Sequence, residues 1–237
     1  LGKVRKTFQQ LGDRVSPIRN KLVRILEDWE KYVSAINARI SEGEAEVEKI
    51  SPLLIHDVLK NADREFHDAN YNNAALKYYR TIEMINQHVL LDRYGIDTQD
   101  PNYDSLPQEV KRDLLGGKPN ESEEEALEEA LLEHYNALWK FIYERQGKGD
   151  EFKPREILPR KLGLLAGLIV RHMFGEKAIN KNFLFNTLQV IENRNQSIFA
   201  HGIVSISKND CEKLQKKANQ MMRVVSVDDQ LKHLVFN

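Results

Sequence analysis

The 237-residue chain contains one cysteine, Cys211, and no long apolar run. A single cysteine excludes an intramolecular disulfide and a cysteine-based zinc site. It fits a reducing compartment, so we expect the protein in the cytoplasm. The longest apolar run, at residues 162–170, falls far short of the roughly 20 residues that span a bilayer. We therefore expect no contact with a membrane.

Several sequence motifs of catalysis are also missing. There is no Gly-rich phosphate loop, no His-Glu-x-x-His, no Glu-x-x-His pair and no Gly-x-Ser-x-Gly. Five of the seven histidines stand singly in helical patterns, and we interpret them as surface or core residues: His56, His67, His88, His134 and His172. The sequence thus predicts no metal and no cofactor. It argues against a di-iron bundle and against a nuclease that needs clustered carboxylates.

The net charge of -1 gives the whole chain no attraction for nucleic acid, so an RNA site must be a local patch. Residues 153–181 hold seven basic side chains and only two acidic ones, Glu156 and Glu176. The basic ones are Lys153, Arg155, Arg160, Lys161, Arg171, Lys177 and Lys181. Of these we predict that the first four bind RNA phosphates. The alternative, a charged loop without a partner, stays open.

The apolar spacing is helical along almost the whole chain. Ser16-Pro17 and Ser51-Pro52 each read as a helix start. We expect Asn72 or Asn73 to cap the next helix, which should stop near Gly95. Ser122 and Glu125 form a capping box before another long helix. Further expected features are a loop at 96–120 around a short helix at 107–115, close packing at Gly163 and Gly167, a turn at 203–206 and a last helix near 208–225.

One stretch combines residue types suited to phosphodiester chemistry. Arg194 and Asn195 are followed by His201 and then by Gly202, a helix stop. In a continuous helix Arg194 and His201 would face the same way, roughly 10 Å apart along the axis. Arginine holds phosphate charge in a fork, and histidine moves a proton near neutral pH. The spacing alone also fits a surface arginine and a histidine stabilised by the helix dipole.

A family resemblance favours the chemical interpretation. Arg194-Asn195 followed by Ala200-His201-Gly202 resembles the Arg-(four to six residues)-His motif of HEPN ribonucleases. The stretch 71–83 resembles a helix of the HEPN effectors of type III CRISPR systems, in which a CARF sensor domain precedes the HEPN domain. The likeness extends back to Trp29. It implies an all-α, HEPN-type helical bundle at residues 51–237. Residues 1–50 would be a helical extension or a linker, and because the chain starts at Leu1 we expect an upstream domain to have been removed.

The resemblance also implies a function, which is metal-independent cleavage of single-stranded RNA in antiviral defence. His201 would move a proton or orient the attacking 2′-OH, Arg194 would stabilise phosphate charge, and Asn195 would orient the phosphate or the histidine. Arg80 and Glu83 would border the cleft as supports, unless they are simply a surface pair. HEPN ribonucleases of this kind work as homodimers.

Regulation by cyclic oligoadenylate would act only through a CARF domain, which we do not find in this chain. Two other functions remain open: a catalytically silent HEPN scaffold that dimerises or binds RNA, and the toxin of a toxin–antitoxin pair.

Overall fold

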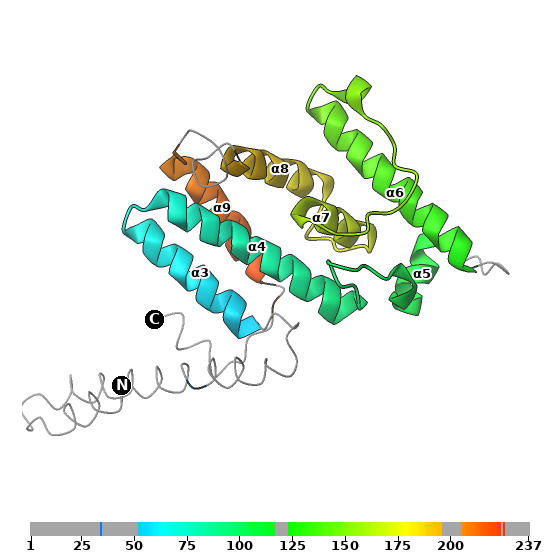
Figure 1. Cartoon of the computed structure of the whole chain (residues 1–237), viewed down its shortest axis with the longest axis horizontal. Coiled ribbons are helices and arrows are strands. Elements are labelled where there is room, and N and C mark those ends of the chain that lie inside the picture. The colour runs from blue at the N-terminus through cyan, green and yellow to red at the C-terminus, as the bar shows by residue number, and fades with distance from the viewer. Residues whose placement is uncertain (1–33, 35–51, 117–122, 196–204, 224, 226–237) are drawn as a thin grey trace, which may run out of the picture.

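The computed structural model describes residues 34, 52–116, 123–195, 205–223 and 225. These residues contain seven α-helices, two 3-10 helices and no strand, which confirms the all-α prediction (Figure 1). In chain order the elements are α3 (Pro52–His67), α4 (Tyr71–Tyr94), η2 (Tyr103–Ser105), α5 (Gln108–Leu114), α6 (Glu123–Arg145), η3 (Gly149–Glu151), α7 (Leu164–Met173), α8 (Lys181–Asn195) and α9 (Lys208–Met222).

Most of the predicted extension at 1–50 lies outside the described residues, so the division of the chain at residue 50 stays a prediction. Within the described part, no helix has the length and apolar character needed to cross a bilayer.

Helix α4 is the centre of the bundle and contacts α3, α7, α8 and α9. Its buried side chains are Ala74, Ala75, Tyr78, Thr81, Ile82, Met84, Ile85, Asn86, Val89, Leu90 and Tyr94. They point to more than one side of the helix, as its position between four neighbours requires. The predicted stop is confirmed: Gly95 adopts a left-handed conformation with φ 68°, and its N–H returns to the Leu90 and Leu91 carbonyls.

The predicted cap of α4 at Asn72 or Asn73 is wrong. The helix begins at Tyr71, so its N-cap is Asn70, two residues before Asn72, and Asn70 makes no side-chain capping bond. The side-chain oxygen of Asn72 instead accepts a hydrogen bond from the backbone N–H of Ile206, at 2.8 Å. The local pattern predicted that the Asn72 side chain would cap α4, but its oxygen is instead used by the Ile206 amide, far away in sequence.

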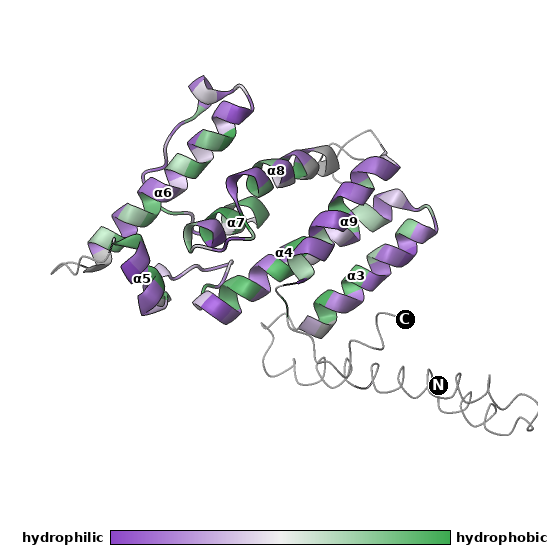
Figure 2. Ribbon diagram, turned by 180° about the vertical axis from the view of Figure 1, so that it is seen from behind, coloured by the Kyte–Doolittle hydropathy of each residue, from purple (hydrophilic) through white to green (hydrophobic). Residues whose placement is uncertain are grey.

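Helices α3 and α9 flank α4, and each buries an apolar face in the bundle. Ile55, Leu59 and Ala62 of α3 are buried. So are Leu214, Ala218, Met221 and Met222 of α9. The Asp63 carboxylate joins all three helices, because it accepts from the Tyr78 hydroxyl at 2.7 Å and from the Gln215 amide at 3.0 Å. In Figure 2, α9 is mostly hydrophilic, whereas hydrophilic and hydrophobic residues alternate along α3.

Gly167 lets α7 approach α4 closely. A Cβ built on Gly167 would lie 2.2 Å from the Asn86 side-chain nitrogen and 3.1 Å from a methyl carbon of Leu90. At Gly163 a Cβ would meet nothing within 4 Å, since this residue is the N-cap of α7. The close packing predicted for the two glycines is therefore confirmed only for Gly167.

Arg171 is part of the core, although the sequence places it among the basic surface residues. Its side chain is 1% exposed, and its guanidinium lies 2.6 Å from the Glu176 carboxylate. It also donates to the Asn86 side chain at 3.4 Å, while the Tyr94 hydroxyl donates to Glu176 at 3.2 Å. Burial and the Glu176 charge raise the pKa of Tyr94 to about 12, so this hydroxyl keeps its proton. The Arg171 charge is internally compensated and does not contribute to an RNA surface.

Helix α6 lies on the far side of the molecule from α3 (Figure 1). Leu127, Leu131 and Leu138 are buried, and α6 contacts α5, α7 and α8. The chain after η3 doubles back along α6. The Asn136 side chain fixes this return by exchanging two 2.9 Å hydrogen bonds with the backbone of Arg155.

Candidate functional site

Helix α8 carries the first part of the predicted catalytic motif at its C-terminal end. The Asn180 side chain accepts from the Phe183 N–H at 2.9 Å and so caps the start of α8. Phe183, Leu184 and Thr187 are buried against the bundle. Arg194 and Asn195 are the last two residues of α8. Their side chains lie outside the described residues, as does the whole segment 196–204 with His201.

Both flanks of that segment are held by the bundle. On one side α8 contacts α7 and α9. On the other side, the Ile206 amide is bound by Asn72 at the start of α4. Ser207 caps α9, since its hydroxyl accepts from the Asp210 N–H at 3.1 Å. The chain therefore leaves the motif on α8 and re-enters the described structure beside the first turn of α4.

Arg80 and Glu83 form the predicted ion pair on α4, with 2.5 Å between guanidinium and carboxylate. Their side chains are 49% and 28% exposed, so the pair lies at the surface of the helix. A pair of this kind contributes little to stability. Their place at the border of a catalytic cleft stays a prediction, since His201 lies outside the described residues.

The four predicted RNA-binding residues are exposed, but the structure spreads them along α6. Arg155 lies opposite Asn136 in the middle of that helix. Lys153 adjoins Phe152, whose ring packs 5.7 Å from the Tyr143 ring. Arg160 lines a pocket at the beginning of α6, beside Lys161 in sequence. The four residues thus follow the length of α6 and are not gathered at the end of α8.

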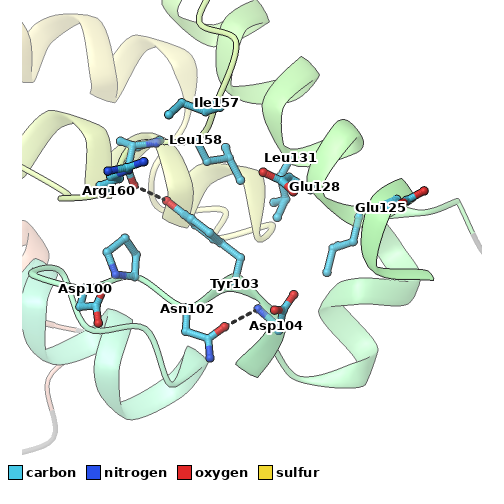
Figure 3. A pocket seen from close by; sticks show the side chains of 13 residues that line it. Asp100, Asn102, Tyr103, Asp104, Glu125, Glu128, Leu131, Ile157, Leu158 and Arg160 are labelled. Carbon is cyan, nitrogen blue, oxygen red and sulfur yellow. Dashed lines mark hydrogen bonds between the residues drawn. The ribbon is translucent and has the colours of Figure 1, made fainter. Parts of the chain in front are cut away.

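The pocket beside Arg160 has a volume of about 650 Å³ and is formed by three separate segments (Figure 3). Tyr103 stands in the middle of it and donates to the Pro159 carbonyl at 3.4 Å. Four carboxylates line it: Asp100, Asp104, Glu125 and Glu128. These charges oppose a phosphate backbone despite Arg160. The start of α6, where the pocket lies, is well separated from the end of α8 in both ribbon views (Figures 1 and 2).

A cluster of cations and aromatic rings joins α6 to α8, and the sequence analysis missed it. The Arg145 guanidinium carbon lies 4.9 Å from the Phe185 ring centre and 5.9 Å from that of Phe141. The Lys181 ammonium lies 5.2 Å from the Phe141 ring centre. Arg145 also donates to the Asn182 side chain at 3.0 Å. A sequence signal exists in the pairs Phe141–Arg145 and Lys181–Phe185, each four residues apart.

Two other reactive side chains lie in or against the core: Cys211 is buried and Lys217 is partly buried. Cys211 is fully buried, and burial raises the pKa of its thiol to about 12, which keeps it a poor nucleophile. Lys217 lies 3.9 Å from the Phe183 ring centre, and burial lowers its pKa. Among the described residues no group of three or more His, Cys, Asp or Glu side chains is arranged to hold a metal ion.

Comparison with known proteins gives one informative result. No curated protein matches the chain. The family model described as "Csm6 HEPN domain" matches residues 44–225. This range contains every helix from α3 to α9 and the positions of Arg194, Asn195 and His201. The match confirms the HEPN resemblance and supports a CRISPR-associated nuclease role. The chain belongs to the Csm6 HEPN domain family.

Proposed function

We propose that the protein is a metal-independent endoribonuclease that cleaves single-stranded RNA in CRISPR-associated antiviral defence. The observation that carries the proposal is the family match over residues 44–225, which contains the Arg194–His201 motif. Arg194 and Asn195 are the last residues of α8, and the opposite end of this helix is capped by Asn180 and packed in the bundle. Two of the three motif residues therefore belong to a helix that the bundle holds in place.

The proposed reaction is a transesterification within the RNA. The ribose 2′-oxygen forms a bond to the adjacent phosphorus while the bond from phosphorus to the 5′-oxygen breaks. The proton of the 2′-OH is lost and the departing 5′-oxygen gains one, which leaves a 2′,3′-cyclic phosphate and a 5′-OH. His201 serves in this proton transfer or orients the 2′-OH. Arg194 stabilises the charge on the phosphate, and Asn195 orients the phosphate or the histidine.

The proposal includes a homodimer. One chain supplies one Arg-His set, and isologous pairing would bring two sets together across a two-fold axis. Arg80 and Glu83 would support the border of that composite cleft. Light scattering at micromolar concentration should report a dimer, and a fully active monomer would contradict this part of the proposal.

A ribonuclease assay on a fluorescent single-stranded RNA tests the activity. His201→Ala and Arg194→Ala should each lower the cleavage rate by several orders of magnitude and leave the thermal midpoint nearly unchanged. Lys213→Ala is the matched control, because Lys213 is a surface residue of α9 paired with Asp210. If the wild type binds RNA without cleaving it, the protein is a silent scaffold. If His201→Ala unfolds the chain, His201 is structural.

Chelation tests the metal-independent mechanism separately. Cleavage should persist in excess EDTA, because the 2′-OH supplies the nucleophile and the proposed charge stabilisation comes from Arg194. Activity that EDTA abolishes and Mg²⁺ or Mn²⁺ restores would contradict this mechanism while leaving the nuclease role intact. In the same assay, cyclic tetra- or hexa-adenylate should leave the rate unchanged, since we expect this ligand to act through a CARF domain.

A further inference from the structure

Two exposed cations, Arg145 and Lys181, lie at the junction of α6 and α8. Neither Arg145 nor Lys181 has an acidic partner within ion-pair distance in the part of the chain that the structure describes. Two acidic residues of the same helices have other partners: Glu144 of α6 lies 4.0 Å from Lys140, and Glu192 of α8 accepts from Gln146 at 2.8 Å. The junction therefore presents positive charge that is available to an anion.

The Arg145 side chain is held in place by its surroundings. Its guanidinium lies near the half-buried rings of Phe141 and Phe185, and Asn182 accepts one of its five N–H donors. Because rings and an amide restrain the side chain, less conformational entropy is lost when the remaining donors bind a phosphate. An arginine that is exposed, ordered and without a carboxylate is well suited to a phosphodiester.

The aromatic content of the junction favours single-stranded nucleic acid over a simple anion. Sites for single strands combine cations along the backbone with rings or guanidinium planes on which bases stack. Phe141 and Phe185 are partly exposed beside the two cations. The acidic pocket at the other end of α6 has the opposite charge and would repel the same ligand.

The junction is also on the helix that carries the motif. Lys181 is the first residue of α8 and Asn195 is the last, about four turns later. The distance along the axis is about 20 Å. A single strand that reaches the end of α8 therefore has a charged and aromatic surface one helix length away.

We infer that Arg145 and Lys181, with Phe141 and Phe185, form a second contact for single-stranded RNA at the start of α8. It rests on the proposed function for the identity of the ligand. The contact would hold the part of the RNA that lies outside the reacting phosphodiester. Lys148, exposed just after the end of α6, would add to its positive charge.

A binding assay without cleavage tests the inference. The probe is a fluorescein-labelled 2′-O-methyl oligoribonucleotide of about 12 nucleotides, within the usual range for single-strand sites. It has no 2′-OH and cannot undergo the proposed reaction. By anisotropy, Arg145→Ala with Lys181→Ala should raise Kd roughly ten-fold and lower the slope of log K against log salt by about 0.7 per lost contact. Lys213→Ala, at an exposed cation of α9 paired with Asp210, is the matched control and should bind like the wild type.

Further measurements separate binding from folding and from chemistry. The thermal midpoint of the double variant should stay near that of the wild type, and Arg145→Lys should keep much of the affinity lost in Arg145→Ala. With a cleavable RNA, Arg145→Ala should raise KM and leave kcat unchanged, because the contact is equally strong in the ground and transition states.

The inference is overturned if the double variant binds the probe with the wild-type Kd and salt slope, if Lys213→Ala loses as much affinity, or if the wild type does not bind. If the wild type binds through Arg145 and Lys181 but cleaves no RNA, the inference stands and the proposed function fails.

Discussion

α4 and α6 are nearly equal in length, 24 and 23 residues, but they have different surroundings. Helix α4 is packed against four other helices, and even its polar residues Thr81 and Asn86 are buried. Helix α6 buries one stripe of leucines and exposes charged side chains on the rest, acidic near its start and basic near its end. Length does not distinguish the two helices. What differs is how many sides of each helix are covered by neighbouring helices. This decides whether its polar side chains are buried in the bundle or exposed on the surface.

We expect the largest effect when a buried ion pair is broken. The comparison is between an ion pair in the core beside α4 and one on the surface of α6. Glu176→Gln leaves the buried Arg171 charge without its carboxylate, and we expect a loss of about 3 kcal/mol in the free energy of unfolding. Glu144→Gln breaks the exposed pair with Lys140 and should cost at most about 0.5 kcal/mol. Urea denaturation measures both. Equal losses of unfolding free energy in the two variants would show that burial does not determine the contribution of these ion pairs.

The second effect comes from the glycines of α7. In Gly167→Ala the new methyl group would collide with Asn86 of α4, so we expect a loss of about 2 kcal/mol. Gly163→Ala is the control, because its methyl group meets nothing within 4 Å and its φ of -65° suits any residue. It should be neutral or slightly stabilising. Thermal midpoints of the two variants give the comparison directly, and a harmless Gly167→Ala would mean that α4 and α7 can separate freely.

The third effect tests whether α4 also serves the site. Asn72→Ala removes the acceptor of the Ile206 N–H and should loosen the chain where it leaves the motif segment. We expect cleavage to fall roughly ten-fold, equivalent to about 1.4 kcal/mol, mainly in kcat. Asn72→Asp keeps an acceptor and should retain most of the rate. Asn61→Ala on α3, which loses only contacts within its own helix turn, serves as the control. A change in stability with an unchanged kcat would make Asn72 purely structural.

The smallest effect concerns pH and the buried His56 of α3, the helix packed along α4. Burial, followed by the Lys60 charge, lowers the pKa of His56 below its usual 6.5. The unfolded chain therefore takes up a proton first as pH falls through 6.5, and stability should fall in that window, by at most about 1.4 kcal/mol per pH unit. His56→Gln should show a flatter dependence between pH 7.5 and about 5.5.

The helices could be predicted from the sequence because helix formation depends mainly on residues close together in the chain. The stripes Ile55, Leu59, Ala62 and Leu214, Ala218, Met221 needed only helical spacing, and Gly95 needed only its tolerance of positive φ. The predictions that failed depended on contacts between segments. Asn72 has the residue type of a cap, but its acceptor is used by an amide 134 residues away.

Charge was the least predictable property of the candidate site. Arg171 and Glu176 are five residues apart, which is not a helix pairing distance, and they meet only because the chain turns at Gly175, with φ 81°. Arg145 and Lys181 belong to different helices, so counting charges in a window of sequence could not group them. The same window placed Arg160 with three RNA-binding candidates, whereas the fold sets it among four carboxylates.

The position of α9 against α4 has a consequence for biosynthesis. Helix α9 packs against α4 but follows it by more than 100 residues of sequence, from Tyr94 to Lys208. A ribosome adding ~5–20 residues per second would need on the order of ten seconds to make that interval. During this time the nascent chain contains the α3–α4 hairpin without α9. The side of the hairpin that α9 later covers with buried residues such as Leu214 and Ala218 is still exposed. The emerging protein is therefore most in need of chaperones after its central helix is made and before its last helix appears.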